Sequence, residues 1–282
     1  MRTLLAVALA GALLQGCSLR EPMPAEHDAE IPTLTPRAST YDDLVNMPKP
    51  KGLVVTAVYG FRDQTGQYKP TPASSFSTSV TQGAASMLMD ALQASGWFMV
   101  LEREGLQNLL TERKIIRASQ QKNGTPANIL AELPPLQAAN IVLEGGIVAF
   151  DSNVRTGGEG ARYLGIGGSN EYRVDQVSVS LRAVDVRSGQ VLANVMTSKT
   201  IYSVARSAGV FKFIELKDLL EVEAGYTVNE PAQLCVLSAI EAAVAHLIAQ
   251  GIERRLWQAT DQVSLKDSPL GKYLAKYRKE AG

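Results

Sequence analysis

Two stretches in the middle of the chain constrain its fold more than any other feature. Residues 154–174 and 204–228 each have room for two strands of about ten residues and a turn, the length that crosses a bilayer when the strands are tilted. The first is rich in glycine around GGEGARYLGIGG, and the second alternates through VFKF at 210–213. Barrel strands tolerate glycine, serine and charge on their lumen side. Solvent-exposed hairpins or an adaptable loop suit the same composition, so the pattern alone leaves these structures open.

A β-hairpin is predicted between these two stretches. Residues 177–182 alternate apolar and polar side chains, which is the period of a half-buried strand. The sequence RSGQ at 187–190 supplies the turn. The glycines at 157–168 do not open a helix after a strand, as the fingerprint of a dinucleotide site requires. The region is therefore predicted to be strands and turns, without a phosphate cradle.

The residues before these strands alternate between strand and helix patterns. β-branched residues at 52–61 predict a strand, a helix follows from Val80 and ends at Gly96, and WFMVLER at 97–103 predicts a buried strand. A second helix with a basic outer side follows from Leu106, and IVLEGGIVAF at 141–150 is the next strand. This order is typical of an α/β domain. Near the C-terminus, an apolar stripe predicts a helix over 234–257.

The N-terminus resembles an export signal that ends in a lipid attachment site. Arg2 precedes the apolar run from Leu4 to Leu14, and LQGC places Cys17 directly after the expected cleavage point. We expect Cys17 to carry the lipid, a palmitate-type acyl chain among its groups, with an ordinary signal peptide as the alternative. The following residues to about 51 are polar and proline-rich, which predicts an extended tether or a wrapping segment. No apolar run after residue 16 approaches spanning length, so a membrane helix is not expected.

The composition narrows the class of function. The chain has 28 basic and 28 acidic residues, so nothing indicates a nucleic-acid partner. Cys235 is the one cysteine besides Cys17, which leaves no intramolecular disulfide. The two histidines are His27 in the tether and His246, which lies opposite the apolar stripe of its helix and is expected to face solvent or another subunit. Without catalytic motifs or metal-binding clusters, we expect no enzyme activity, no metal and no cofactor.

Several blocks of sequence together resemble one known family. They are GQYKPTPASSFSTSV, LEREGLQNLLTERKIIRASQ, AANIVLEGGIVAFDSNV, GGEGARYLGIGG and EAGYTVNEPAQLCVLSAIEAAV. These blocks are similar to the curli production assembly and transport lipoproteins, the CsgG-type secretion channels. The likeness runs from about Pro36 to Trp257, with the lipid attachment site ahead of it.

The resemblance implies a secretion channel in the outer membrane. It implies an α+β fold in which a periplasmic α/β domain contributes two transmembrane β-hairpins to a barrel shared by a homo-oligomer, a nine-fold ring. The cargo it implies is unfolded curli (amyloid) subunits, passed outward without nucleotide hydrolysis. Curli accessory proteins in the periplasm and outside the cell are the implied partners.

The resemblance also implies a constriction loop at residues 67–79. Phe76 matches the family's ring phenylalanine, whereas Thr71 and Ser75 replace a tyrosine and an asparagine of the best-known pattern. Both replacements are smaller, which predicts a wider constriction with Phe76 as its main narrowing. Taken without the resemblance, Phe76 is typical of a core aromatic that caps the helix beginning near Val80.

A rival interpretation of another class is a monomeric outer-membrane lipoprotein that serves as a periplasmic binding or regulatory module, with the glycine-rich stretches as docking loops. An enzyme is the third. The expected organisation is a signal peptide at 1–16, a lipidated tether or wrapping segment at 17–51, the α/β domain at 52–153, transmembrane hairpins at 154–174 and 204–228 around a linking β-hairpin at 175–203, a helix at 229–258 and a tail at 259–282.

Overall fold

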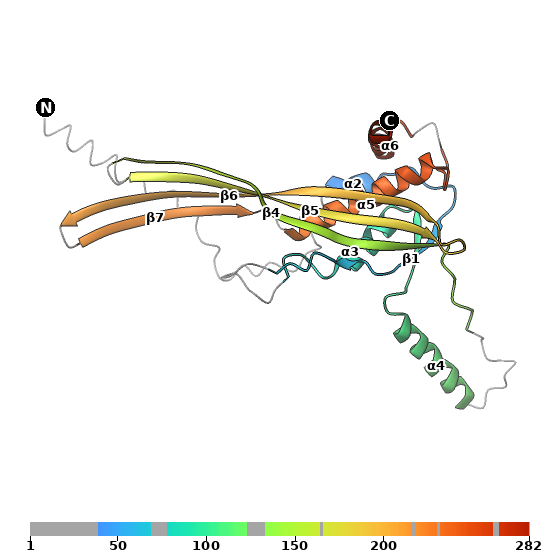
Figure 1. Ribbon diagram of the computed structural model, residues 1–282. Coiled ribbons are helices and arrows are strands. Elements are labelled where there is room, and N and C mark those ends of the chain that lie inside the picture. Colours follow the sequence, from blue (N-terminus) through green and yellow to red (C-terminus); the bar gives the residue numbers. More distant parts are fainter. Residues whose placement is uncertain are drawn as a thin grey trace. The chain divides into compact units, whose positions relative to one another are not determined.

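The computed structural model is a mixed sheet with helices packed on it (Figure 1), which confirms the mixed α/β class. It describes residues 39–68, 78–122, 133–163, 166–215, 218–229, 232–261 and 265–281. The elements in chain order are α2 (Ser39–Val45), β1 (Val54–Val58), β2 (Arg62–Asp63), α3 (Ala84–Ala94), β3 (Phe98–Leu101), α4 (Leu106–Lys122), β4 (Ile141–Tyr163), β5 (Ile166–Asp185), β6 (Val191–Glu215), β7 (Asp218–Asn229), α5 (Ala232–Glu253) and α6 (Pro269–Ala281).

One sheet joins all the strands of the described chain. Its order is β3-β1-β4-β5-β6-β7, and β2 pairs with β4 beside this path. The pairs β1 with β3, β1 with β4 and β2 with β4 are parallel, whereas the pairs from β4 to β7 are antiparallel. The parallel half follows from the crossovers through α3 and α4, since parallel neighbours need such connections. In the antiparallel half, each strand pairs with the strand that follows it in the chain.

The core lies between one face of the sheet and the helices α3 and α5. Leu143, Ile147 and Leu181 from the strands are fully buried against Leu88 of α3 and Ile240 of α5. The expectation that no apolar run after residue 16 reaches spanning length is wrong for α5. The helix over residues 233–253 contains an 18-residue window with a mean hydropathy of 1.6, and within the described chain this is the one helix long and apolar enough to cross a membrane. However, 83% of that window is buried inside the fold, as expected of a helix in a protein core.

The four long strands extend beyond the part of the sheet that α3 and α5 cover (Figure 1). Backbone pairing of β4 with β5 runs from Ile141↔Asp185 to Tyr163↔Ile166. Pairing of β6 with β7 runs from Ser203↔Asn229 to Glu215↔Asp218. The stretches that the sequence separates into 154–174, 175–203 and 204–228 are therefore parts of continuous strands, because alternation in the sequence gives no boundary where a strand leaves its core.

The C-terminal end of the segment 17–51, predicted to be an extended tether or a wrapping segment, packs against the domain. Residues 39–45 form the helix α2, in which Leu44 is fully buried, and Met47 is 8% exposed. The next residues lie along the segment after α5, where the backbone N–H of Lys51 donates to the carbonyl of Gln258 at 2.8 Å. Polar composition concealed a segment that packs through a few apolar side chains.

The tail expected at 259–282 contains the helix α6. Leu270 is fully buried, and Leu274 is 6% exposed. His246, predicted to face solvent or another subunit, is half-buried, and its ring packs edge-on against that of Tyr273 in α6, with centroids 4.9 Å apart. The helix α6 lies against this face of α5, and the periodicity of α5 gives no sign of it because α6 is a separate element of the chain.

Candidate functional site

The residues predicted to form the constriction and the lipid site lie outside the described chain. These are Thr71, Ser75 and Phe76 in the stretch 69–77, and Cys17 in 1–38. The structure describes the two chain segments that flank 69–77, residues 62–68 and 78–83, which we call the stem. At the end of the stem, Tyr68 and Thr78 form an antiparallel bridge, and the backbone N–H of Ser79 donates to the carbonyl of Gln67 at 2.9 Å. The two segments of the stem are therefore paired where they lead into residues 69–77.

Asp63 organises the base of the stem. Its Oδ1 accepts from the backbone N–H of Thr65 at 2.8 Å and from the Thr65 hydroxyl at 2.7 Å, which closes the turn after β2. Its Oδ2 accepts from the Nε2 of Gln82 at 3.0 Å, on the opposite side of the stem. One carboxylate thus shapes one strand of the stem and connects it to the other.

Both sides of the stem begin in the hydrophobic core. Phe61 precedes β2 and is 3% exposed, and Val80 on the other side is 4% exposed. Ala84, the first residue of α3, is fully buried. Since these side chains exclude water, the stem is anchored to the packed domain at both of its roots.

A pair of glycines brings the stem close to the sheet. The backbone φ angles of Gly145 and Gly146 are +150° and +152°, and a Cβ on Gly146 would collide with the carbonyl oxygen of Arg62. A Cβ on Gly145 would collide with the carbonyl oxygen of Ser180. Only glycine allows β2 and β5 to approach β4 this closely on both sides. The side chain of Gln64 uses the space, since its Nε2 donates to the carbonyl of Gly145 at 2.8 Å.

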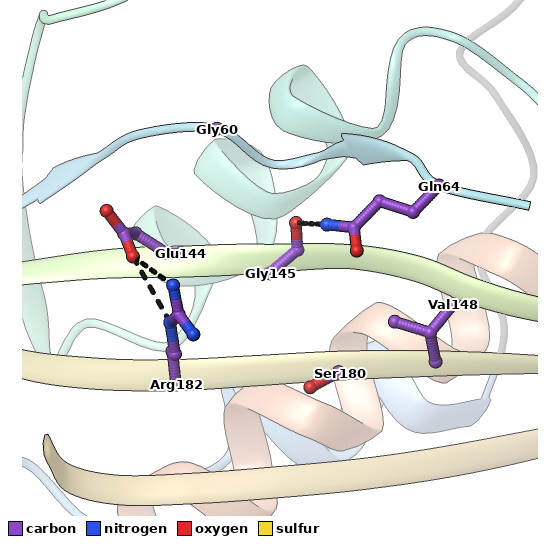
Figure 2. Close-up of a pocket in the computed structure, with 7 residues that line it drawn as sticks. All are labelled: Gly60, Gln64, Glu144, Gly145, Val148, Ser180 and Arg182. Carbon is purple, nitrogen blue, oxygen red and sulfur yellow. Dashed lines mark hydrogen bonds and ion pairs between the residues drawn. The ribbon is translucent and has the colours of Figure 1, made fainter.

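A hollow of about 320 Å³ lies beside this contact (Figure 2). Glu144 and Arg182 form an ion pair at 2.7 Å along its wall. They lie on the sheet face opposite the core, since their neighbours Leu143 and Leu181 are fully buried. Val148 also lines the hollow and sits at the register shift between Ile147 and Ala149. The ion pair is partly exposed, so its net contribution to stability is small.

The sequence did not identify Asp63, Gln64, Gln82 or the glycine pair as parts of a site. The signal for the glycines was present, because two adjacent glycines within a strand pattern indicate a close backbone approach. The polar residues carried no comparable signal. Among the described residues there is also no group of three or more side chains that could hold a metal ion.

The strands beyond the core form the second part of the candidate site. In the described sheet β4 has β1 and β2 on one side only as far as Ile147, so beyond that residue β4 and β7 are the edge strands of the extended part. An edge strand presents unpaired N–H and C=O groups that can pair with another chain. The fold therefore defines a class of protein: an α/β domain that carries two extended antiparallel strand pairs and a stem whose two segments flank residues 69–77.

Comparison with known proteins identifies the family within this class. The family model of the curli production assembly/transport component CsgG matches residues 37–277, and the chain belongs to this family. The chain is 49% identical over 269 residues to the curli production assembly/transport component CsgG of Citrobacter koseri, covering 95% of this chain and 96% of the relative. It is 50% identical over 261 residues to that of Escherichia coli K12, covering 93% of each.

Solved structures offer a weaker likeness. The PelC dodecamer from Paraburkholderia phytofirmans matches with a TM-score of 0.26 and 14% identity, covering 73% of this chain and 92% of the PelC chain. A TM-score this low does not bear on the architecture.

Proposed function

We propose that the protein is an outer-membrane lipoprotein whose copies form a ring and export unfolded curli subunits without nucleotide hydrolysis. Family membership supports the role in curli secretion, since the match to curated curli transport components covers nearly the whole of both chains. Transport, and not catalysis, is the proposed activity. Cys17 would anchor each copy through its lipid.

The observation that carries the proposal is the pair of strand extensions. Residues 155–163 pair with 166–174, and residues 203–215 pair with 218–229, in antiparallel register. In a bilayer every backbone polar group must find a partner within the protein, so a strand edge cannot face lipid. Four strands from one copy leave two edges. Closure with neighbouring copies removes the edges, and a nine-fold ring is the arrangement we propose.

The constriction would be built from the loop on the stem. We propose that Phe76 of each copy contributes to an apolar collar, with Thr71 and Ser75 beside it. Apolar contact is non-directional, so an unfolded chain of varied sequence can slide past without being held by specific bonds. Because Thr71 and Ser75 are small, Phe76 would be the main narrowing.

Electron microscopy of the detergent-extracted protein viewed along the ring axis tests the assembly. We expect a ring with a central pore. A lipoprotein that is monomeric in detergent, and that is released into buffer when Cys17 is replaced by serine, would instead indicate the binding or regulatory module.

Single-channel recording in planar bilayers tests the constriction. Phe76→Ala is expected to raise the conductance, because it removes the widest side chain from the proposed collar. An unchanged conductance in Phe76→Ala would remove Phe76 from the pore while leaving the channel itself in place.

A further inference from the structure

We propose that Asp63 and Gln82 are positioning residues of the channel. Their hydrogen bond across the base of the stem sets the spacing of the two chain segments from which residues 69–77 depart. This inference rests on the proposed function, since it matters only if that stretch lines a pore. Neither side chain is proposed to touch the cargo.

The stem is cross-linked at two levels. Near its end, the Tyr68–Thr78 bridge and the Ser79-to-Gln67 hydrogen bond join backbone to backbone. At its base, the 3.0 Å bond from Gln82 to Asp63 joins side chain to side chain. Two contacts at different heights fix both the distance between the two segments of the stem and the direction in which the segments point. With one contact alone, the segments could pivot about it.

The two partners belong to elements that are held independently. Asp63 is the last residue of β2, and it pairs with Ile147 of β4. Gln82 precedes α3, between Val80 and Ala84, which are both buried in the core. At the base of the stem, the Asp63–Gln82 bond therefore joins the segment that continues from β2 directly to the segment that leads into α3.

The bond can be removed without dismantling the fold. Gln82 is exposed, and the bond lies at the surface of the domain. A hydrogen bond in such a place contributes little to folding stability, although it still biases one local arrangement over its alternatives. In a ring of identical copies the same bias acts on every stem, so a local change is repeated around the pore.

Single-channel recording of two substitutions at Gln82 tests the inference. Gln82→Leu cannot donate to Asp63, and we expect secondary conductance levels to become about fivefold more populated than in the wild type. Gln82→Lys replaces the bond by an ion pair with Asp63. At low salt, the secondary conductance levels of this variant should be populated as in the wild type. At high salt they should become more populated, because salt screens an exposed ion pair. Currents are normalised to their mean before the comparison.

Gln93 provides the matched control, since it is an exposed glutamine on α3 away from the stem. Gln93→Leu and Gln93→Lys should leave the current unchanged at every salt concentration. A conducting wild type whose current levels do not respond to either Gln82 substitution would overturn this inference alone. A wild-type ring that passes no current would overturn the proposed function, and this inference with it. If Gln82→Leu fails to assemble, the salt dependence of Gln82→Lys decides.

Discussion

A single glycine determines how the end of α5 packs. The chain reverses after α5 at Arg255, whose φ of 60° is unusual for a residue other than glycine. This reversal returns Trp257 onto the helix, where its Nε1 donates to the carbonyl of Ile248 at 2.9 Å. A Cβ on Gly251 would collide with the indole ring. The predicted helix over 234–257 therefore ends at Glu253, because Trp257 packs back on the helix and does not extend it.

Gly251→Ala should lower the free energy of unfolding by about 2 kcal/mol, because overpacking a filled contact outweighs the better helix propensity of alanine. Thermal unfolding followed by circular dichroism of the detergent-extracted protein would show a lower Tm. Gly52→Ala is the control, since a Cβ there meets no atom within 4 Å. Equal Tm values for the two variants would contradict the proposed contact.

At the scale of elements, α2 and α6 fasten the two ends of the described domain onto α5. The Tyr273 hydroxyl of α6 donates to Oδ2 of Asp43 in α2 at 3.0 Å, and the Thr40 hydroxyl of α2 donates to the carboxylate of Glu241 in α5. Glu241 is 1% exposed. These contacts explain why the sequence did not predict α2 and α6, because each helix is short and is stabilised by a partner distant in the sequence.

Leu44→Ala should cost about 3 kcal/mol of unfolding free energy, since it leaves a cavity where α2 meets the core. Val45→Ala in the same helix should be close to neutral, because Val45 is 45% exposed. Chemical denaturation of both variants provides the measurement. A Leu44→Ala protein as stable as Val45→Ala would show that α2 does not dock as described.

The contact between α6 and α2 should weaken at alkaline pH. Burial raises the pKa of Tyr273, and the hydrogen bond to Asp43 and the negative charges of Asp43 and Glu241 raise it further. The folded protein thus holds this proton more tightly than the unfolded chain, whose tyrosines keep the ordinary pKa of 10.0. The stability from this group is complete below pH 10 and is lost as the pH rises beyond it.

Tyr273→Phe tests this pH dependence. The variant should lose about 1 kcal/mol at neutral pH, because a hydrogen bond is removed, and its stability should fall less steeply than that of the wild type above pH 10. Tm values measured from pH 7 to pH 11 on both proteins, and their difference at each pH, provide the comparison. Parallel curves would show that Tyr273 does not titrate in this environment.

At the scale of the whole molecule, one sheet serves both the domain and the strand extensions. The same β4 that buries Leu143 and Ile147 in the core continues to Tyr163. The pairing of β5 with β6 runs unbroken from Ala183↔Ala193 in the domain to Ile166↔Val210 in the extension, whereas the register of β4 against β5 shifts between Asp151 and Arg155. A domain that folds through its own core can present the extensions for assembly, which fits the proposed ring.

The proposed pore should be wider than one lined by larger side chains at two positions. Thr71→Tyr combined with Ser75→Asn is expected to lower the single-channel conductance, since both substitutions add volume next to Phe76. Planar-bilayer recording of the double variant beside the wild type is the measurement. A conductance that stays the same would place both residues away from the narrowing.

The sequence alone determined the elements whose signals are local. Alternation of apolar and polar residues predicted the strands, helical spacing and Gly96 predicted α3 close to its observed bounds, and long matching blocks identified the family. These signals lie within one element, where the periodicity of the backbone decides which side chains share a face.

The tertiary structure decided what depends on pairs of residues distant in the sequence. Gln82 and Asp63 are 19 residues apart, and Tyr273 and Asp43 are 230 apart. Neither pair shows in the local pattern, because a polar residue looks alike whether it faces water or a partner. The stem, the docking of α2 and α6 and the reversal at Trp257 arise from such contacts, which exist only once the core has brought the elements together.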